Sequence, residues 1–293
     1  MKIFVWILLF LLVINVIAAL ITVFRKPRSI SSVLAWMMTL IFLPGIGFII
    51  YLFCGRGIDG QEVFKLSDDE KQMVQRIKEK VDVDNKKAGR DKRYDLLYDA
   101  KVLNRYFRNM DASPLAKRNS LQLFTDGQEK FQALFEDIRA AKETVHVEYY
   151  AFFNDTIGNQ FLDVLIEKLH EGVEVYLIYD PWGSPGANKK FFARYVDAGG
   201  KVAPFITSRD MIRKTRLNYH LHRKIVVIDG KIGWTGGFNV GDQYLNVTEK
   251  FGYWRDTHIR LVGTAVFSLQ EIFIMDWNAS VKYPEERMTY QDR

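Results

Sequence analysis

Six residues within eighteen positions carry the chemistry of this chain; they are His222, Lys224, Asp229, Gly236, Gly237 and Asn239. A neutral imidazole can attack phosphorus while an ammonium group neutralises the non-bridging oxygens of the phosphate. Residues two apart in an extended segment point the same way, so His222 and Lys224 are expected to project to one side. The pattern predicts a site that makes and breaks phosphodiester bonds.

The other members of the stretch are given supporting roles. Gly236 and Gly237 would let the backbone approach the substrate, and Asn239 would donate a hydrogen bond to the phosphate. A nucleophilic histidine also needs an acceptor for its other nitrogen. Asp229 completes the catalytic group, although Asp229-Gly230 is also typical of a tight turn, and we expect Asp256 to orient the imidazole.

The four remaining histidines are expected to be structural or surface residues; they are His146, His170, His220 and His258. The signature occurs once in 293 residues. A leaving alcohol must be protonated by a second group, so the single copy is expected to form half of a site. The lone cysteine, Cys54, gives no zinc pattern and no intrachain disulfide, and we expect neither a metal nor a cofactor.

The N-terminal region 1–54 is expected to be a membrane anchor of two transmembrane helices. Ile3–Phe24 carries no charge and is long enough to cross a bilayer. A second uncharged run, Val33–Phe53, is interrupted by proline and glycine. A cleaved signal peptide is the less favoured alternative, because the first run is too long for one. The flanking charges leave the orientation open. The net charge of +6 suits anionic lipid and is weak evidence for nucleic acid.

The rest of the chain divides into a charged linker, 55–118, with a helix from Ser67 to about Lys80, and a domain, 119–293, of alternating elements. Hydrophobic periodicity predicts four helices in this domain, at 128–141, 159–170, 189–198 and 265–277. Segments rich in β-branched and aromatic residues predict strands at 145–152, 173–179, 202–205, 225–228, 232–235 and 258–261. This order is typical of an α/β domain with a mixed β-sheet flanked by helices.

Further motifs carry a resemblance to a known family. They are Leu43-Pro44-Gly45-Ile46-Gly47, Tyr51-Leu52-Phe53-Cys54-Gly55-Arg56, Glu148-Tyr149-Tyr150-Ala151-Phe152 with Asp155 and Gly158, Tyr179-Asp180 with Gly183-Ser184, and Trp254-Arg255-Asp256-Thr257-His258. With the signature, they make the region 119–263 similar to the N-terminal half of the phospholipase D superfamily. Together with the N-terminal region, the chain resembles the bacterial cardiolipin synthases.

The resemblance implies a multi-pass protein of the bacterial cell membrane that transfers a phosphatidyl group without a metal. His222 would attack one phosphatidylglycerol to form a phosphatidyl-histidine, and glycerol would leave. A hydroxyl of a second phosphatidylglycerol would then release cardiolipin. Lys224 and Asn239 would bind the phosphate, with anionic membrane lipid as the partner and no nucleic acid.

The family also carries a second signature, whose histidine supplies the acid and base. That group is expected to come from a homodimer or from a C-terminal half. Two alternatives stay open: a truncated, non-catalytic half that binds lipid or a partner, and a phospholipase D hydrolase or nuclease that uses water. If a second half is missing, we also expect an exposed apolar face made of Phe267, Ile272, Phe273, Ile274 and Trp277.

Overall fold

The computed structural model describes residues 29–43, 45–55, 68–88, 102–103, 115–205, 220–247 and 249–288, with isolated positions between 6 and 21. The chain forms two compact units. The first comprises residues 1–63 and 207–219, and the second comprises residues 64–206 and 220–293. Each unit is described by itself.

The first unit contains a short helical hairpin. Helix α2 (Ile30–Phe42) begins at Ser29, whose hydroxyl accepts a hydrogen bond from the backbone of Ser32. Helix α3 (Ile46–Ile50) follows Gly45, whose φ of 80° suits a residue without a side chain. A π-helical turn, η1 (Tyr51–Gly55), continues it. The rings of Trp36 and Tyr51 meet edge to face at 5.1 Å, so the hairpin closes on an aromatic contact.

The prediction of two transmembrane helices is wrong. Among the residues described, no helix is both long enough and apolar enough to span a bilayer. The predicted second span, Val33–Phe53, is divided into α2 and α3 because the chain turns at Gly45. With 13 residues, α2 is about 20 Å long, against about 30 Å of hydrocarbon. The predicted first span, Ile3–Phe24, lies mostly outside the described residues.

The second unit is built on a seven-stranded mixed sheet of order β1-β7-β6-β5-β2-β3-β4. Its strands are β1 (Ser120–Phe124), β2 (Thr144–Tyr149), β3 (Glu174–Tyr179), β4 (Lys201–Pro204), β5 (Lys224–Ile228), β6 (Ile232–Gly236) and β7 (His258–Val262). The pairs β2–β3 and β3–β4 are parallel, and the other pairs are antiparallel. The α/β part of the prediction, a mixed sheet flanked by helices, is therefore confirmed.

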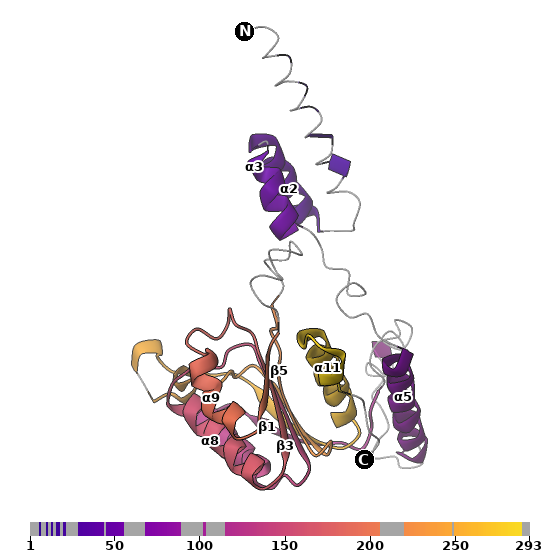
Figure 1. Ribbon diagram of the computed structural model, residues 1–293. Coiled ribbons are helices and arrows are strands. Elements are labelled where there is room, and N and C mark those ends of the chain that lie inside the picture. The colour runs from indigo at the N-terminus through magenta and orange to yellow at the C-terminus, as the bar shows by residue number, and fades with distance from the viewer. Residues whose placement is uncertain are drawn as a thin grey trace. The chain divides into compact units, whose positions relative to one another are not determined.

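Helices cover both faces of this sheet (Figure 1). One face packs against α7 (Gly127–Arg139), α8 (Thr156–His170) and α9 (Lys189–Asp197) in the main hydrophobic core. The other face packs against α11 (Val266–Ser280). Because side chains alternate along a strand, Val226 and Ile228 of β5 enter the main core, while Ile225 and Val227 contact the α11 side. We call these the α7 face and the α11 face.

The expected exposed apolar face on α11 is not found. Phe273, Ile274 and Trp277 are at most 3% exposed because they pack against the sheet, and Phe267 and Ile272 are half-buried. Helix α5 (Asp68–Ala88), which extends beyond the predicted segment, contacts α11. The Lys80 ammonium lies 5.5 Å from the ring centroid of Phe267. The fold therefore covers this surface itself.

Asp229 closes the β5–β6 hairpin and ties it to the start of β2. Its φ is 51°, in the left-handed region, and Gly230 follows with 61°. The Asp229 carboxylate accepts hydrogen bonds from the backbone amides of Lys142, Glu143 and Thr144 at 2.8–2.9 Å. Hydrogen bonds to a charged acceptor are among the stronger ones in proteins. The Asp229 carboxylate therefore stabilises the junction between the β5–β6 turn and the start of β2.

We expect Asp229→Ala to lower the free energy of unfolding by roughly 2–4 kcal/mol, because three amides lose a charged acceptor. Urea denaturation followed by circular dichroism measures this loss. The control is Asp163→Ala, which removes an exposed ion pair with Arg194 and should cost less than about 1 kcal/mol. Equal stability of the two variants would contradict the structural role of Asp229.

Candidate active site

His222 and Lys224 lie together at the start of β5. His222 is exposed, whereas Lys224 is only 4% exposed and donates to the His222 carbonyl oxygen at 3.3 Å. Tyr150, at the end of β2, contacts both: its ring centroid is 4.8 Å from the imidazole and 5.3 Å from the Lys224 ammonium. The structure thus places an accessible imidazole and a buried ammonium group against the same tyrosine ring.

Electrostatics favour the neutral form of His222. Partial burial and, to a smaller extent, the positive charge of Lys224 lower its pKa below 6.5. Burial also lowers the pKa of Lys224 to about 8, against the opposing attraction of the Asp256 carboxylate. Near pH 7 the pair therefore combines a neutral imidazole with a positively charged ammonium, the combination required to attack a phosphodiester.

Asp180, which follows β3, holds the segment that leads into the signature. Its carboxylate accepts hydrogen bonds from the backbone amides of Leu221 and Trp182, both at 2.8 Å. Nδ1 of His220 lies 3.5 Å from the same carboxylate. Sequence reasoning did not identify Asp180 or Tyr150 as site residues. The available signal was that both follow the carboxyl ends of neighbouring parallel strands, which meet at one edge of the sheet.

The two glycines make room for residues of β7 and the segment before it. A Cβ atom on Gly237 would lie 1.9 Å from Oδ1 of Asp256. One on Gly236, whose φ is 154°, would lie 2.5 Å from the Cα of His258. Asp256 also accepts a hydrogen bond from the backbone of Thr257 at 2.7 Å. The glycines thus admit the Asp256 carboxylate, while no hydrogen bond among the described residues joins it to His222.

Asn239 is buried and joins two loops. Its side-chain oxygen accepts from the backbone of Ala151 at 3.1 Å, and its amide donates to the Tyr244 hydroxyl at 2.8 Å. An amide group carries two N–H donors, and within the described residues only one of them has an acceptor, which leaves the other for a ligand. Asp229 follows the last residue of β5, whereas His222 precedes the first, which separates them by about 17 Å of strand. Asp229 is therefore not among the groups around His222.

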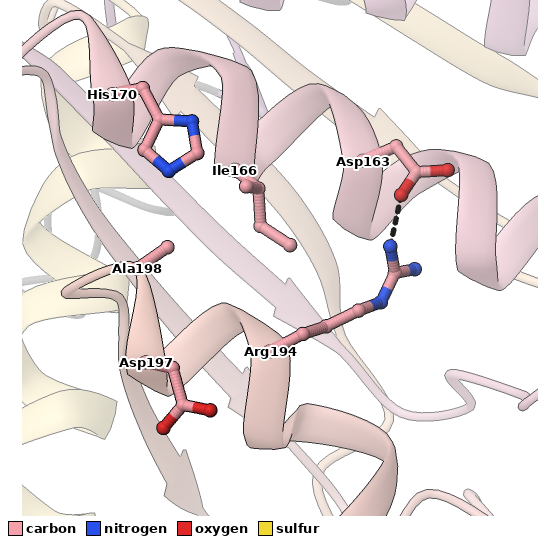
Figure 2. Close-up of a pocket in the computed structure, with 6 residues that line it drawn as sticks. All are labelled: Asp163, Ile166, His170, Arg194, Asp197 and Ala198. Atoms are coloured by element: carbon pink, nitrogen blue, oxygen red, sulfur yellow. Dashed lines mark hydrogen bonds and ion pairs between the residues drawn. The ribbon is translucent and has the colours of Figure 1, made fainter.

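One surface hollow lies away from this region, between α8 and α9 (Figure 2). Asp163, Ile166 and His170 line it from α8, and Arg194 and Asp197 from α9. The ion pair between Arg194 and Asp163 crosses it. None of the six signature residues lines this hollow, so it is separate from the candidate active site.

Comparison with known proteins gives the family. Residues 134–263 match the family model described as "Cardiolipin synthase, PLD-like domain", and residues 13–56 match the "Phospholipase_D-nuclease N-terminal" model. Cardiolipin synthases of Listeria monocytogenes and Staphylococcus aureus are 42% and 40% identical over 94% and 96% of this chain. The chain belongs to the cardiolipin synthase family of phospholipase D-like proteins. All the signature residues and Asp256 fall within the first matched range.

The chain spans 57% and 56% of the length of these two relatives. Among solved structures, Nuc of Salmonella typhimurium, a phospholipase D family member, is 16% identical with a TM-score of 0.44, covering 57% of this chain and 99% of Nuc. The match to the cardiolipin synthase family confirms the family predicted from the sequence motifs.

Arg223, between His222 and Lys224, links this site to the α11 face of the sheet. Its guanidinium pairs with Asp276 of α11, whose side chain is fully buried. Glu148 of β2 is also fully buried and faces Asp276; no N–H or hydroxyl group of the described residues donates to it. Burial and then the charge of Asp276 raise its pKa well above the usual value. The raised pKa favours the neutral, protonated form of Glu148 beside Asp276, whose carboxylate pairs with Arg223.

The raised pKa of Glu148 makes stability depend on pH. Its contribution is complete below the unfolded pKa of about 4.3 and is lost as pH rises toward the folded value. Glu148→Gln keeps a donor but cannot ionise, so we expect a shallower fall in the free energy of unfolding between pH 5 and pH 8, on the order of 1 kcal/mol or more.

The measurement is urea denaturation at several pH values. Glu174→Gln, at the exposed start of β3, is the control and should keep the wild-type slope. A Glu148→Gln variant with the wild-type slope would show that Glu148 does not carry the proton.

Proposed function

We propose that this chain provides the nucleophilic half of a phosphatidyltransferase that converts two phosphatidylglycerol molecules into cardiolipin and glycerol. The observation that carries the proposal is the exposed, neutral His222 above the buried, charged Lys224. Membership of the cardiolipin synthase family supports phosphatidyl transfer as the reaction.

The chemistry divides into two displacements at the same phosphorus. An imidazole nitrogen of His222 forms a bond to phosphorus, and the bond to the glycerol oxygen breaks, with that oxygen taking a proton to leave as glycerol. A hydroxyl of a second phosphatidylglycerol then attacks the phosphatidyl-histidine, loses its proton and frees His222. Lys224 and the remaining N–H of Asn239 would bind the non-bridging oxygens, whose charge grows as each new bond forms.

The proton for the departing glycerol needs a second group opposite His222. In this proposal a second phospholipase D-like domain supplies it, either from a second copy of the chain or from a C-terminal half. The exposure of His222 supports this arrangement, because a complete site would shield the intermediate from water.

The substrate places the reaction at a membrane surface. In the first unit, apolar side chains of α2 and α3 are exposed, including Ile30 at 80%, Phe42 at 73% and Ile46 at 63%. Large apolar side chains exposed in this number suit contact with lipid or protein. We infer that this helical hairpin contacts lipid and keeps the chain close to its substrate.

The test is to incubate the purified chain with phosphatidylglycerol and analyse the products. Cardiolipin with glycerol supports transfer, whereas phosphatidic acid would indicate hydrolysis instead. If the chain alone is inactive, addition of a C-terminal half of a related synthase should restore cardiolipin formation. His222→Ala should abolish the phosphoenzyme trapped by acid quench. A His222→Ala protein that still forms it would refute the assignment of the nucleophile.

The two shifted pKa values predict a bell-shaped pH dependence of kcat/KM, which reports the free enzyme. Activity should rise as His222 loses its proton, below pH 6.5, and fall as Lys224 loses its own near pH 8. Lys224→Arg should move the alkaline limb above pH 9, because a guanidinium stays charged.

Lys189→Arg is the control, since Lys189 is exposed at the start of α9. It should keep the wild-type profile. An unchanged alkaline limb in an active Lys224→Arg enzyme would assign that limb to another group.

A further inference from the structure

Three basic residues lie buried on the α7 face of the sheet, and we call them the basic cluster: Lys130, Lys224 and His258. Their exposed fractions are 0%, 4% and 1%. Three basic groups at this depth need an explanation, because buried cations are normally paired with carboxylates or bound anions.

The sheet register brings the cluster together. Lys224 of β5 pairs with Tyr149 of β2, and His258 of β7 pairs with Gly236 of β6. The β5–β6 ladder, one residue beyond its last pair, places Lys224 opposite Gly236. Lys224 and His258 therefore flank a position that has no side chain. Lys130 extends from α7 toward these paired positions, and its ammonium donates to the hydroxyl of Tyr149, the β2 partner of Lys224, at 2.9 Å.

The cluster is short of acceptors. Besides that hydroxyl, the Lys130 ammonium has the ring of Phe131, with its centroid at 3.6 Å. Neither ring nitrogen of His258 has a hydrogen-bond partner within the described part of the chain. The rings of Trp234 and Phe238 lie beside it at 6.3 and 6.2 Å. A buried imidazole with two unsatisfied nitrogens destabilises the free protein.

The pKa shifts agree with this picture. Burial, followed by the positive charges of Lys130 and Lys224, lowers the pKa of His258 well below 6.5. Burial alone lowers the pKa of Lys130 well below its usual value. Among the described residues, Asp256 attracts the Lys224 ammonium, and no carboxylate contributes to the pKa shifts of Lys130 and His258. A bound anion would satisfy the donors that the protein leaves without acceptors.

We propose that the basic cluster binds a phosphate oxygen above Gly236, with His258 and Lys130 extending the phosphate site beyond Lys224 and Asn239. The inference rests on the proposed function, because the phosphate concerned is the one that His222 attacks. A lipid phosphodiester and free phosphate share this chemistry, and the experiment separates them.

The variants are chosen so that a loss of binding can be told apart from a loss of folding: the first leaves the melting temperature unchanged or higher, whereas the second lowers it. Lys130→Met and His258→Phe replace buried basic groups by apolar ones of similar size, and the melting temperature should stay the same or rise. The controls lie outside the cluster. Lys168→Met removes a fully buried lysine bound to Glu171 and the Arg139 carbonyl, and His146→Phe removes a buried imidazole stacked on Phe273.

Isothermal titration of the purified full chain with inorganic phosphate and with dihexanoyl-phosphatidylglycerol measures the affinity. Lys130→Met and His258→Phe should each weaken binding of the lipid about tenfold or more, as expected for loss of a hydrogen bond to a charged group. Lys168→Met and His146→Phe should bind as the wild type does.

Wild-type affinity for both ligands in both cluster variants, or no binding of either ligand to the wild-type chain, would overturn the proposal. Weakened binding of inorganic phosphate alone would overturn its lipid part and leave a free-phosphate site. The cardiolipin assay is independent: a chain that binds the lipid through the cluster but forms no product would refute the proposed function and not the subsite.

Discussion

The burial of the Lys224 ammonium beneath an exposed imidazole is the constraint on which the rest of the site depends. A charge removed from water interacts more strongly with a phosphate, but it costs folding free energy and loses its proton more readily. The pKa of Lys224, about 8, reflects the balance between burial, which favours the neutral amine, and the attraction of Asp256, which favours the ammonium. Asp256 restores part of the charged form, and Gly237 makes that possible by leaving space for its carboxylate.

Because side chains alternate along β5, a phosphate-binding lysine and an arginine paired with a carboxylate can lie within three residues of each other. His222 and Lys224 serve the α7 face and its edge, while Arg223 points to the α11 face and pairs with Asp276. The acidic pair Glu148–Asp276 thus fixes Arg223 on the α11 face, on the side of the sheet opposite to the proposed phosphate site. The sheet keeps the acidic anchor and the basic site on separate faces.

Much of the fold could be predicted from periodicity and turn chemistry. The alternating strands and helices after residue 119 gave the mixed sheet, and the Asp229-Gly230 turn joins β5 to β6. The prediction failed where residue composition alone could not show the path of the backbone or the packing of a helix. Uncharged residues 33–53 satisfy a hydropathy criterion, yet the backbone turns at Gly45. The apolar residues of α11 looked like an unpartnered face because the sequence does not show that α5 and the sheet would cover them.

The site was predictable where neighbours in sequence are neighbours in space, and much less so where strands bring distant residues together. His222 and Lys224 are two residues apart, and the signature was sufficient to find them. Tyr150, Asp180 and His258 lie 36 to 72 positions from His222, and only the register of β2, β3 and β7 brings them near it. His258 was expected to be structural, an expectation that fits most buried histidines. What distinguishes it is that neither ring nitrogen has a hydrogen-bond partner among the residues that the structure describes. A residue that only stabilised the fold would be expected to have its hydrogen bonds satisfied. The unsatisfied imidazole therefore lowers the stability of the free protein, which is consistent with a group that is kept for binding a ligand.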